Sequence, residues 1–510
     1  MKRVFLLVLV ALLSMAFVAC GETTTEATTA GTTVAPTTEA PKDDLTITGY
    51  MTAETLDPFQ VASSDKVTNF QIFDSLVRYG EGGVITPGLA SEWTLGEDGL
   101  TYTFTIRENV LFHNGETLTT EDIIFSLDTM MAQPMNSWMA TYIASYTRVD
   151  ATTIQIVKAS PFAKVLNILA DRFFVVPEAS YDGLEETFAA NPIGTGAYKF
   201  VSQAADKSVT LIKNEDYFFG EPAISNVHII APVEASAAVI QLESGDVDII
   251  FGIPTSQKTI ITDNSDLTFV ETAGWSMHTL LLLGDQFADD LNLRKAVSYA
   301  VNPQNAILVA NEGVGAVPTN LFSTKTMGDL AGEVAIPGYD AVESAAALAL
   351  SNYSTETNLV ITVDASAAAI AQSIQSDLAA VGITVTIEQL DTNNLFAKLM
   401  NNELDMTILP MGTHMNGVEE MLAFPIMPPF SFGMNPSEAR TTIIQNIQVE
   451  TDPTLRAQMC IQALQYAVAE FDIVPVFEPV QNLAYANTIT GIPAISAATN
   501  IFYLGDVTPA

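Results

Sequence analysis

Three short apolar runs in the second half of this chain constrain its fold more than any other feature. They are rich in β-branched residues, which is typical of strands buried on both faces, and they occupy residues 359–363 (LVITV), 383–387 (ITVTI) and 404–409 (LDMTIL). Helix-like segments at residues 365–381 and 393–400 separate the runs, and Ile370, Ile374 and Leu378 share one face of the first. This alternation predicts an α/β fold with a parallel sheet and a ligand outside the strands' carboxyl ends.

Other local patterns predict the bounds of single elements. Residues 101–106 (TYTFTI) alternate polar and apolar side chains, as a half-buried strand does. Thr119 and Asp122 have the spacing of a capping box, which predicts a helix from that point. Gly382 directly follows the segment of residues 365–381 and is a natural residue to end a helix.

The N-terminal residues predict export from the cell. Lys2 and Arg3 precede an apolar run over residues 4–18, which is too short for a lasting membrane span. The run ends in FVACG, which resembles the lipobox of bacterial lipoproteins, although Phe17 replaces the usual branched residue. We interpret residues 1–20 as a signal peptide with lipobox and Cys20 as the lipidated mature N-terminus. The alternative is cleavage elsewhere and free secretion.

Composition, length and charge predict the organisation of the remaining chain. Residues 21–42 are nearly all Thr, Ala, Glu, Gly and Pro, which predicts a disordered Thr-rich tether. Residues 43–510 are too many for one core and predict two or three domains. A net charge of −39 repels phosphate backbones, so nucleic-acid binding is not expected. Cys460 has no partner but Cys20, and we expect a small buried hydrophobic residue there rather than a catalytic thiol.

A series of short motifs follows one order from residue 45 to residue 510. They are LDP at 56–58, FDSLV at 73–77, PGLASEW at 87–93, DGLTYTFTIR at 98–107, VLFHNGE at 110–116, NPIGTGAY at 191–198, NEDYFFG at 214–220, LESGDVDI at 242–249 and LRKAVSYAV at 293–301. Together they resemble the bacterial extracellular solute-binding proteins of family 5, which include dipeptide-, oligopeptide- and nickel-binding lipoproteins of ABC transporters. We expect Gly115, Gly194 and Gly196 to permit turns that a side chain would obstruct. Arg107 and His113 are expected to tie turns together.

The resemblance implies a periplasmic-binding-protein-like type II fold, with two lobes around a cleft and an extra subdomain inserted in the first lobe. Carried over to this chain, lobe I comprises residues 43–58, 193–274 and 480–510. The inserted subdomain then comprises residues 59–192, and lobe II comprises residues 275–479. The hinge lies near residues 274–275 and 478–479. Ligand binds between the lobes, closure buries it, and the membrane permease recognises the closed form.

The resemblance also implies the function. We expect a monomeric substrate-binding protein of an ABC importer, anchored outside the cytoplasm through Cys20, that delivers a small solute to the permease. An oligopeptide or peptide-like compound is the leading ligand class, and a metal-chelate binder of the nickel type is the alternative. A surface adhesin or receptor and a hydrolase are two further hypotheses. Catalytic residues, cofactors and a metal cage are not expected, because the sequence carries none of the common hydrolase, metalloprotease or phosphate-binding motifs.

The loop after residues 404–409 departs from the pattern of the family's peptide binders. Those relatives carry a Trp and an Asp there, and the Asp pairs with the peptide ammonium. Met411 stands near the Trp position and the uncharged Asn416 near the Asp position, while Glu419 offers a nearby carboxylate. His414 lies in the same loop and is either a soft-metal ligand or an ordinary loop histidine.

Three more residues are candidates for contact with the ligand. Trp275 lies at the expected lobe crossing, where its ring either stacks on ligand or packs structurally. Trp138 lies in the inserted subdomain and within reach of the cleft. Arg172 stands near where some relatives grip a ligand carboxylate, and a structural ion pair is the alternative for it.

Overall fold

The computed structural model describes residues 42–48, 53–60, 66–80, 83–161, 163–413, 417–427, 430–492 and 501–510. Residues 42–510 form one compact unit. Cys20 and nearly the whole expected tether therefore lie outside the described residues. Within the described ranges, no helix is long and apolar enough to cross a membrane.

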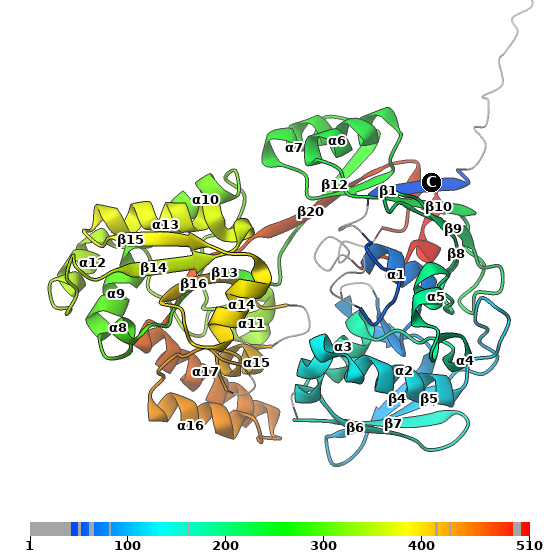
Figure 1. Ribbon diagram of the computed structural model, residues 1–510, viewed down its shortest axis with the longest axis horizontal. Helices are drawn as coiled ribbons and strands as arrows, with labels where there is room; N and C mark the ends of the chain where they lie inside the picture. Colours follow the sequence, from blue (N-terminus) through cyan, green and yellow to red (C-terminus); the bar gives the residue numbers. More distant parts are fainter. Residues whose placement is uncertain are drawn as a thin grey trace, which may run out of the picture. The chain divides into compact units, whose positions relative to one another are not determined.

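A seven-stranded sheet takes its strands from three distant parts of the chain (Figure 1). In spatial order they are β12 (Leu267–Ala273), β20 (Val480–Ala486), β11 (Ile249–Phe251), β1 (Asp44–Thr48), β10 (Asn226–Ile230), β9 (Val209–Lys213) and β8 (Tyr198–Gln203). Helices α6 (Ala235–Ser244) and α7 (Thr255–Thr262) pack against β11 and β12, and α1 (Lys66–Ile72) packs against β8. β1 runs parallel to β10 and β11, and the other pairs are antiparallel.

A four-stranded antiparallel sheet lies within residues 90–158. Its order is β4 (Ala90–Leu95), β5 (Thr101–Ile106), β7 (Thr153–Lys158) and β6 (Ile143–Arg148). The predicted strand at residues 101–106 is thus confirmed as β5. The helices around it are α2 (Thr120–Ala132), η2 (Pro134–Thr141), α3 (Val165–Arg172), α4 (Glu178–Tyr181) and α5 (Glu185–Ala190), and the hairpin β2 (Val77–Tyr79) and β3 (Ile85–Pro87) precedes it. The capping box of Thr119 and Asp122 at the start of α2 is also confirmed.

A five-stranded sheet lies within residues 277–477. Its order is β15 (Val385–Gln389), β14 (Leu359–Val363), β16 (Met406–Met411), β13 (Met277–Leu282) and β19 (Ile473–Phe477). The parallel pairing predicted for β15, β14 and β16 is confirmed, but β13 and β19 join the sheet antiparallel. β15 and β16 each begin two residues later than predicted.

Helices cover both faces of this sheet. They are α8 (Asp285–Ala288), α9 (Leu291–Ala300), α10 (Pro303–Ala310), α11 (Thr324–Met327), η3 (Gly328–Leu330), α12 (Ala341–Leu348), η4 (Ala365–Ala367), α13 (Ala368–Ala380), α14 (Thr392–Met400), α15 (Val418–Ala423), α16 (Glu438–Ile447) and α17 (Pro453–Glu470), with the hairpin β17 (Ile426–Met427) and β18 (Phe430–Ser431) between α15 and α16. Leu280 and Leu282 of β13 enter one core, and Leu281 and Leu283 enter another. Cys460 lies in the second core with no exposure, as expected of a buried hydrophobic residue.

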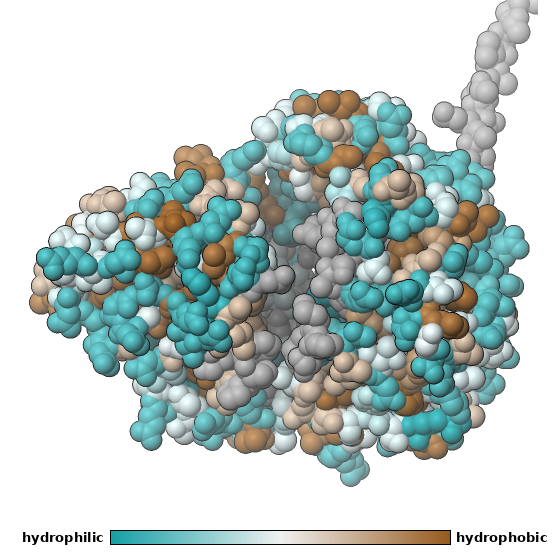
Figure 2. Space-filling view, viewed as in Figure 1, coloured by the Kyte–Doolittle hydropathy of each residue, from teal (hydrophilic) through white to brown (hydrophobic). Residues whose placement is uncertain are grey.

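The distribution of cores divides the described chain into two bodies. One hydrophobic cluster contains both Leu45 of the seven-stranded sheet and Phe104 of the four-stranded sheet. The five-stranded sheet has two clusters of its own, and among the described residues no cluster joins it to the other sheets. The surface is hollowed between these bodies (Figure 2). The division into lobe I (43–58, 193–274 and 480–510), an inserted subdomain (59–192) and lobe II (275–479) stays a prediction. Buried apolar side chains lie on each side of its boundaries at residues 274–275 and 479–480.

The chain passes between the two bodies at two neighbouring crossovers. One runs from the end of β12 at Ala273 to the start of β13 at Met277, and the other from Phe477 of β19 to Val480 of β20. The Gly274 N–H donates a 2.9 Å hydrogen bond to the Pro479 carbonyl, so the two crossovers touch. A Cβ on Gly274 would lie 2.8 Å from the same carbonyl oxygen, which explains why a glycine stands there. The C-terminal residues complete the first body with η5 (Leu504–Asp506) and the pair β21 (Ile489–Thr490) and β22 (Thr508–Pro509).

Candidate functional site

Two of the sequence motifs, at residues 110–116 and 191–198, contact each other through His113. His113 lies between two glycines: the Gly194 N–H donates to Nδ1 at 3.3 Å, and Nε2 bonds the Gly196 carbonyl at 3.0 Å. A Cβ on Gly194 would lie 2.0 Å from the Ile72 carbonyl oxygen, and a Cβ on Gly196 would lie 2.3 Å from that of Gln71. Both glycines are therefore needed for close backbone approach. The expectation that His113 and the glycines shape turns is confirmed.

Asp74 ties three of the motifs together. Its carboxylate accepts hydrogen bonds from the Thr195 hydroxyl at 2.9 Å and from the Tyr217 hydroxyl at 3.0 Å. Burial raises the pKa of Asp74 to about 6, while these hydrogen bonds and Arg78 pull it down. The pairing fixes the start of the hairpin that carries Arg78.

Helix α11 fastens the two crossovers to each other. The Trp275 carbonyl accepts hydrogen bonds from the Ser323 hydroxyl at 2.7 Å and the Thr326 hydroxyl at 2.9 Å. The Glu478 carboxylate accepts from the N–H and the hydroxyl of Thr324, at 3.2 and 3.0 Å. One short helix therefore holds both places at which a rotation between the bodies would take place.

A cavity with a volume of about 1330 Å³ opens beside these crossovers. We call it the hinge pocket. Its charged lining residues are Arg78, Arg107, Lys325 and Asp506, and its aromatic lining residues are Tyr79, Phe219, Trp275, Tyr485 and Tyr503. The volume suits a ligand somewhat larger than a typical drug, and the mixture of cations and rings suits an anionic or aromatic one.

Guanidinium groups and aromatic rings stack along one wall of the hinge pocket. The Arg78 guanidinium lies 3.9 Å from the centre of the Tyr503 ring and 5.0 Å from that of Phe219. Arg107 lies 5.1 Å from the same Phe219 ring, and its Nε donates to the Gly88 carbonyl at 2.7 Å. Arg78 also pairs with Asp506. The stack holds both guanidinium planes in place before any ligand arrives.

Lys325 of α11 approaches from the second body. Its Nζ donates to the Thr272 hydroxyl at 2.9 Å and lies 5.4 Å from the centre of the Trp275 ring. Desolvation lowers the pKa of Lys325, and the negative charge of Glu478 opposes that shift. Within the described ranges, neither Lys325 nor Arg107 has a carboxylate at ion-pair distance.

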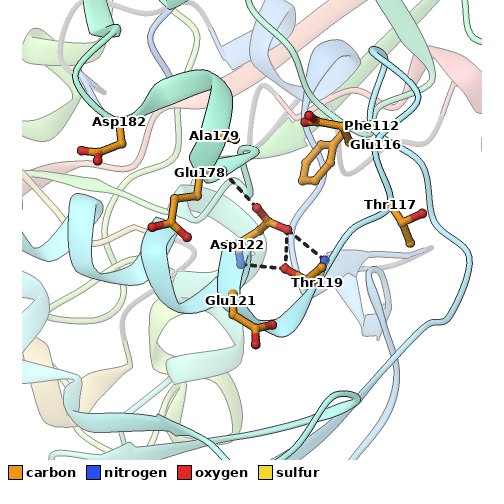
Figure 3. Close-up of a pocket in the computed structure, with 9 residues that line it drawn as sticks. All are labelled: Phe112, Glu116, Thr117, Thr119, Glu121, Asp122, Glu178, Ala179 and Asp182. Atoms are coloured by element: carbon orange, nitrogen blue, oxygen red, sulfur yellow. Dashed lines mark hydrogen bonds between the residues drawn. The ribbon is translucent and has the colours of Figure 1, made fainter.

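A second cavity, of about 550 Å³, has the opposite charge (Figure 3). Its lining includes five carboxylates, which are Glu116, Glu121, Asp122, Glu178 and Asp182. Asp122 is occupied by the capping box, because it accepts hydrogen bonds from the backbone N–H and hydroxyl of Thr119 and from the Glu178 N–H. The carboxylates of this cavity would repel an anionic ligand. One of them, that of Asp122, is already used to cap helix α2.

The two bodies also approach each other away from the crossovers. A Cβ on Gly417, before α15, would lie 3.3 Å from Cε of Lys164, before α3. Burial and the neighbouring Glu419 raise the pKa of Glu420 to about 7, and Lys164 lowers it. A lysine of one body thus lies beside an acidic helix start of the other.

The structure places the candidate ligand residues in different surroundings. Trp275 lines the hinge pocket. Arg172 Nε lies 2.7 Å from the buried carboxylate of Asp171, which fits the structural alternative. Met411 is 2% exposed within a core of the second body. Glu419 lies 3.4 Å from Arg456 Nε. These residues do not form one cluster around the hinge pocket.

Several candidates lie beyond what the structure describes. His414 and Asn416 fall outside the described residues, as does Cys20. Trp138 lies in η2, but its side chain is not among those described. In the described part of the chain, no three His, Cys, Asp or Glu side chains are grouped closely enough to hold a metal ion.

Sequence reasoning missed Arg78, Lys325 and Asp506, and it assigned Arg107 to a turn only. The turn role of Arg107 is confirmed by its bond to Gly88. A usable signal existed, because only 20 Lys and Arg accompany 59 Asp and Glu in this chain. Each of the few cations is therefore a candidate for a special role. No local pattern, however, predicts that Arg78, Arg107 and Lys325 line one pocket.

Comparison with known proteins gives a family match. A model described as bacterial extracellular solute-binding proteins, family 5 Middle, matches residues 84–424. A curated relative, the nickel-binding periplasmic protein of Escherichia coli (strain K12), is 25% identical over 297 residues, which are 56% of this chain and 56% of that protein. Di/tripeptide-binding protein 2 of Pseudomonas aeruginosa is 24% identical over 376 residues, 66% of this chain and 70% of that protein. The matches thus span little more than half to about two thirds of these relatives.

Solved structures share the fold over nearly the whole chain. The ABC transporter-associated periplasmic binding protein DppA of Helicobacter pylori, solved with the peptide STSA, has a TM-score of 0.74 at 22% sequence identity. The superposition covers 91% of this chain and 98% of that one. The predicted periplasmic-binding-protein-like type II fold is confirmed.

Proposed function

Because this chain belongs to the bacterial extracellular solute-binding proteins of family 5, we propose that it is the substrate-binding protein of an ABC importer. It captures a small solute outside the cytoplasm, with a peptide or peptide-like compound as the leading class. The observation that supports this proposal most directly is the cavity of about 1330 Å³ beside the two crossovers. A cavity at such a junction is a usual place for a ligand.

Binding is coupled to rotation of one body against the other. Each body keeps its own apolar core, so a rotation about residues 274–276 and 478–479 would leave both cores packed. A ligand that contacts both bodies stabilises the closed arrangement by its differential affinity for that state. The permease then recognises the closed form.

The protein acts by binding and needs no catalytic group. The buried thiol of Cys460 fits this view, because burial raises its pKa to about 12 and leaves it unreactive at neutral pH. Incubation with peptides should therefore return them unchanged. A turnover product in the bound fraction, detected by mass spectrometry, would contradict the proposal.

Two relatives support the peptide class by what their names state. One is a di/tripeptide-binding protein of Pseudomonas aeruginosa, and the other is the Helicobacter pylori protein solved with a peptide. Trp275 is the candidate residue for stacking on the ligand. Asn416 and Glu419 are the candidates for its ammonium end, with Trp138 and His414 as further proposed contacts.

A ligand screen on the full chain tests this function. The panel contains di- to pentapeptides, amino acids, opines and oligosaccharides, and the readout is the thermal unfolding midpoint. A ligand at 100 times its Kd should stabilise the protein by roughly 2.7 kcal/mol. Stabilisation by peptides, confirmed by calorimetric titration, is the expected result. If no peptide binds while another solute does, the proposed peptide class is wrong. The proposal of an importer then stands, with that solute as its ligand.

A metal-chelate ligand is the second candidate, because a relative is named as a nickel-binding protein. The same screen therefore includes nickel with free histidine, nickel alone and histidine alone. Stabilisation by the chelate but by neither component would favour this alternative. Loss of that stabilisation in His414→Ala would assign the histidine as a ligand.

Membrane anchoring is proposed through Cys20. A diacylglyceryl thioether at this residue would hold the chain at the membrane surface without a spanning helix. Expression of the full chain should place it in the membrane fraction, and Cys20→Ser should release it in soluble form. An unchanged distribution of the Cys20→Ser variant would exclude a lipid anchor at this residue.

A further inference from the structure

We infer that Lys164 of the first body and Glu420 of the second form a latch that holds the two bodies together. Lys164 directly precedes α3, and Glu420 lies in α15. These two helices face each other on the side away from β20 (Figure 1). The inference rests on the proposed function only for its effect on ligand affinity, because closure is part of that function.

Three charged side chains meet at Gly417, the residue before α15. A Cβ there would lie 2.7 Å from Glu419 Oε2, 3.2 Å from Glu420 Oε2 and 3.3 Å from Lys164 Cε. The lysine stem of one body and the carboxylates of the other therefore surround a single point. A side chain at this position would force them apart, which explains why a glycine stands there.

The two carboxylates of α15 have different partners. Glu419 lies 3.4 Å from Nε of Arg456, which belongs to α17 of the same body. Glu420 accepts the Gly417 N–H at 2.8 Å through Oε2. Within the described ranges, Glu420 Oε1 is buried and accepts no hydrogen bond. A buried carboxylate oxygen of this kind is costly, and Lys164 supplies a positive charge close to it.

The charge of Lys164 acts on Glu420 across the contact. Burial raises the pKa of Glu420 to about 7, Glu419 adds to the rise, and the positive charge of Lys164 opposes it. The lysine thus favours the ionised carboxylate. This attraction would be lost if the bodies rotated apart, so the pair stabilises the arrangement in which they touch.

A second pair of charges meets between the same two bodies. Lys158 of β7 is 6% exposed, and its Nζ donates to the Pro161 carbonyl. Burial lowers the pKa of Lys158, and the positive charge of Arg456 on the other body lowers it further. Lys158 and Arg456 repel each other, so the attraction between Lys164 and Glu420 must offset this repulsion for the contact to hold.

Zero-length cross-linking tests the contact on the full chain without added ligand. A water-soluble carbodiimide joins a lysine amine to a carboxylate that touches it, and mass spectrometry of the digest locates the new amide. We expect a link between Lys164 and Glu420. Lys398 and Glu388, whose charged atoms lie 2.9 Å apart within the second body, provide the positive control. Recovery of the control link alone would overturn the inference.

Charge reversal tests the role of the pair in holding the bodies together. Lys164→Glu and Glu420→Lys should each enlarge the radius of gyration measured by small-angle X-ray scattering, because each places like charges at the contact. The double variant should return the radius to the wild-type value. Lys398→Glu is the matched control, since it breaks an ion pair inside one body, and it should leave the radius unchanged.

Lys164→Met replaces Lys164→Glu if the reversal fails to fold, with a smaller increase expected. An unchanged radius in both Lys164→Met and Glu420→Lys would overturn the inference even if the cross-link forms.

Ligand affinity separates this inference from the proposed function. For any solute that the screen identifies, Lys164→Met should weaken binding by about two- to fivefold, since closure loses one ion pair. Unchanged affinity would show that the latch does not contribute to the closed form. If the screen identifies no solute, the importer proposal loses its support, while the cross-link and the radius of gyration still decide whether the latch exists.

Discussion

His113 shows how one side chain can hold a turn only in its neutral form. Its Nδ1 accepts the Gly194 N–H, so the ring proton is on Nε2 and is donated to the Gly196 carbonyl. A second proton would place two N–H groups against each other. Burial lowers the pKa of His113 to about 4, and the positive charge of Lys199 contributes to that shift.

Stability should therefore fall as the pH falls from about 6.5 to 4. The unfolded chain takes up a proton near the ordinary histidine pKa of 6.5, whereas folded His113 does so only near 4. The contribution is fully present above pH 6.5 and amounts to about 3 kcal/mol at most. Urea unfolding of His113→Gln at pH 7 and pH 4.5 should show a smaller pH dependence than the wild type.

The control for this experiment is His228→Gln, since the His228 side chain on β10 is 41% exposed. It should reproduce the wild-type pH dependence. Some dependence should persist in His113→Gln, because burial also lowers the pKa of His278 to about 4. An unchanged slope in His113→Gln would show that its neutral form is not required.

At the scale of elements, an ion cluster docks α16 against the end of α17 and the start of β19. Arg440 of α16 has no exposure, and its Nη1 lies 2.7 Å from Asp472 and 3.0 Å from Glu470. Burial raises the pKa of Asp472 in spite of Arg440, so the pair is held at some cost in desolvation. The cluster thus joins α16 to the end of α17 and to the start of β19.

Removal of Arg440 should be costly for this reason. Arg440→Leu would leave Asp472 buried without a partner, which should lower the free energy of unfolding by about 3–5 kcal/mol. Arg148→Leu is the control, because Arg148 forms an ion pair with Glu121 with both side chains about half exposed, and its loss should cost about 1 kcal/mol or less. Similar midpoints for the two variants in urea would contradict a structural role for Arg440.

At the scale of the whole molecule, the proposed closure depends on the separation of the buried cores on the two sides of the crossovers. The bodies are joined by two crossovers that α11 fastens together, and they have no common core among the described residues. A rotation there would leave each apolar core intact, and a ligand that contacts both bodies could select the closed arrangement.

Small-angle X-ray scattering should detect this rotation. Saturation with a binding peptide should reduce the radius of gyration of the full chain, while a sugar that does not bind should leave it unchanged. An identical radius of gyration with and without bound peptide would rule out closure as the response.

Local pattern was enough to predict much of the fold. The strand at residues 359–363, the helix face of Ile370, Ile374 and Leu378, and the helix end at Gly382 were predictable from side-chain periodicity. Each depends on residues that are neighbours in sequence. The family and its fold were also predictable, since the motifs occur in one order along the chain.

Tertiary packing, in contrast, brings together residues that are far apart in the sequence. It accounts for the antiparallel entry of β13 and β19, the burial of Arg440 and the convergence of Arg78, Arg107 and Lys325. These positions follow from how sheets and helices pack, and no local spacing encodes that packing. The class of binding protein could thus be identified from the order of residues alone, whereas the charge of the hinge pocket depends on the three-dimensional fold.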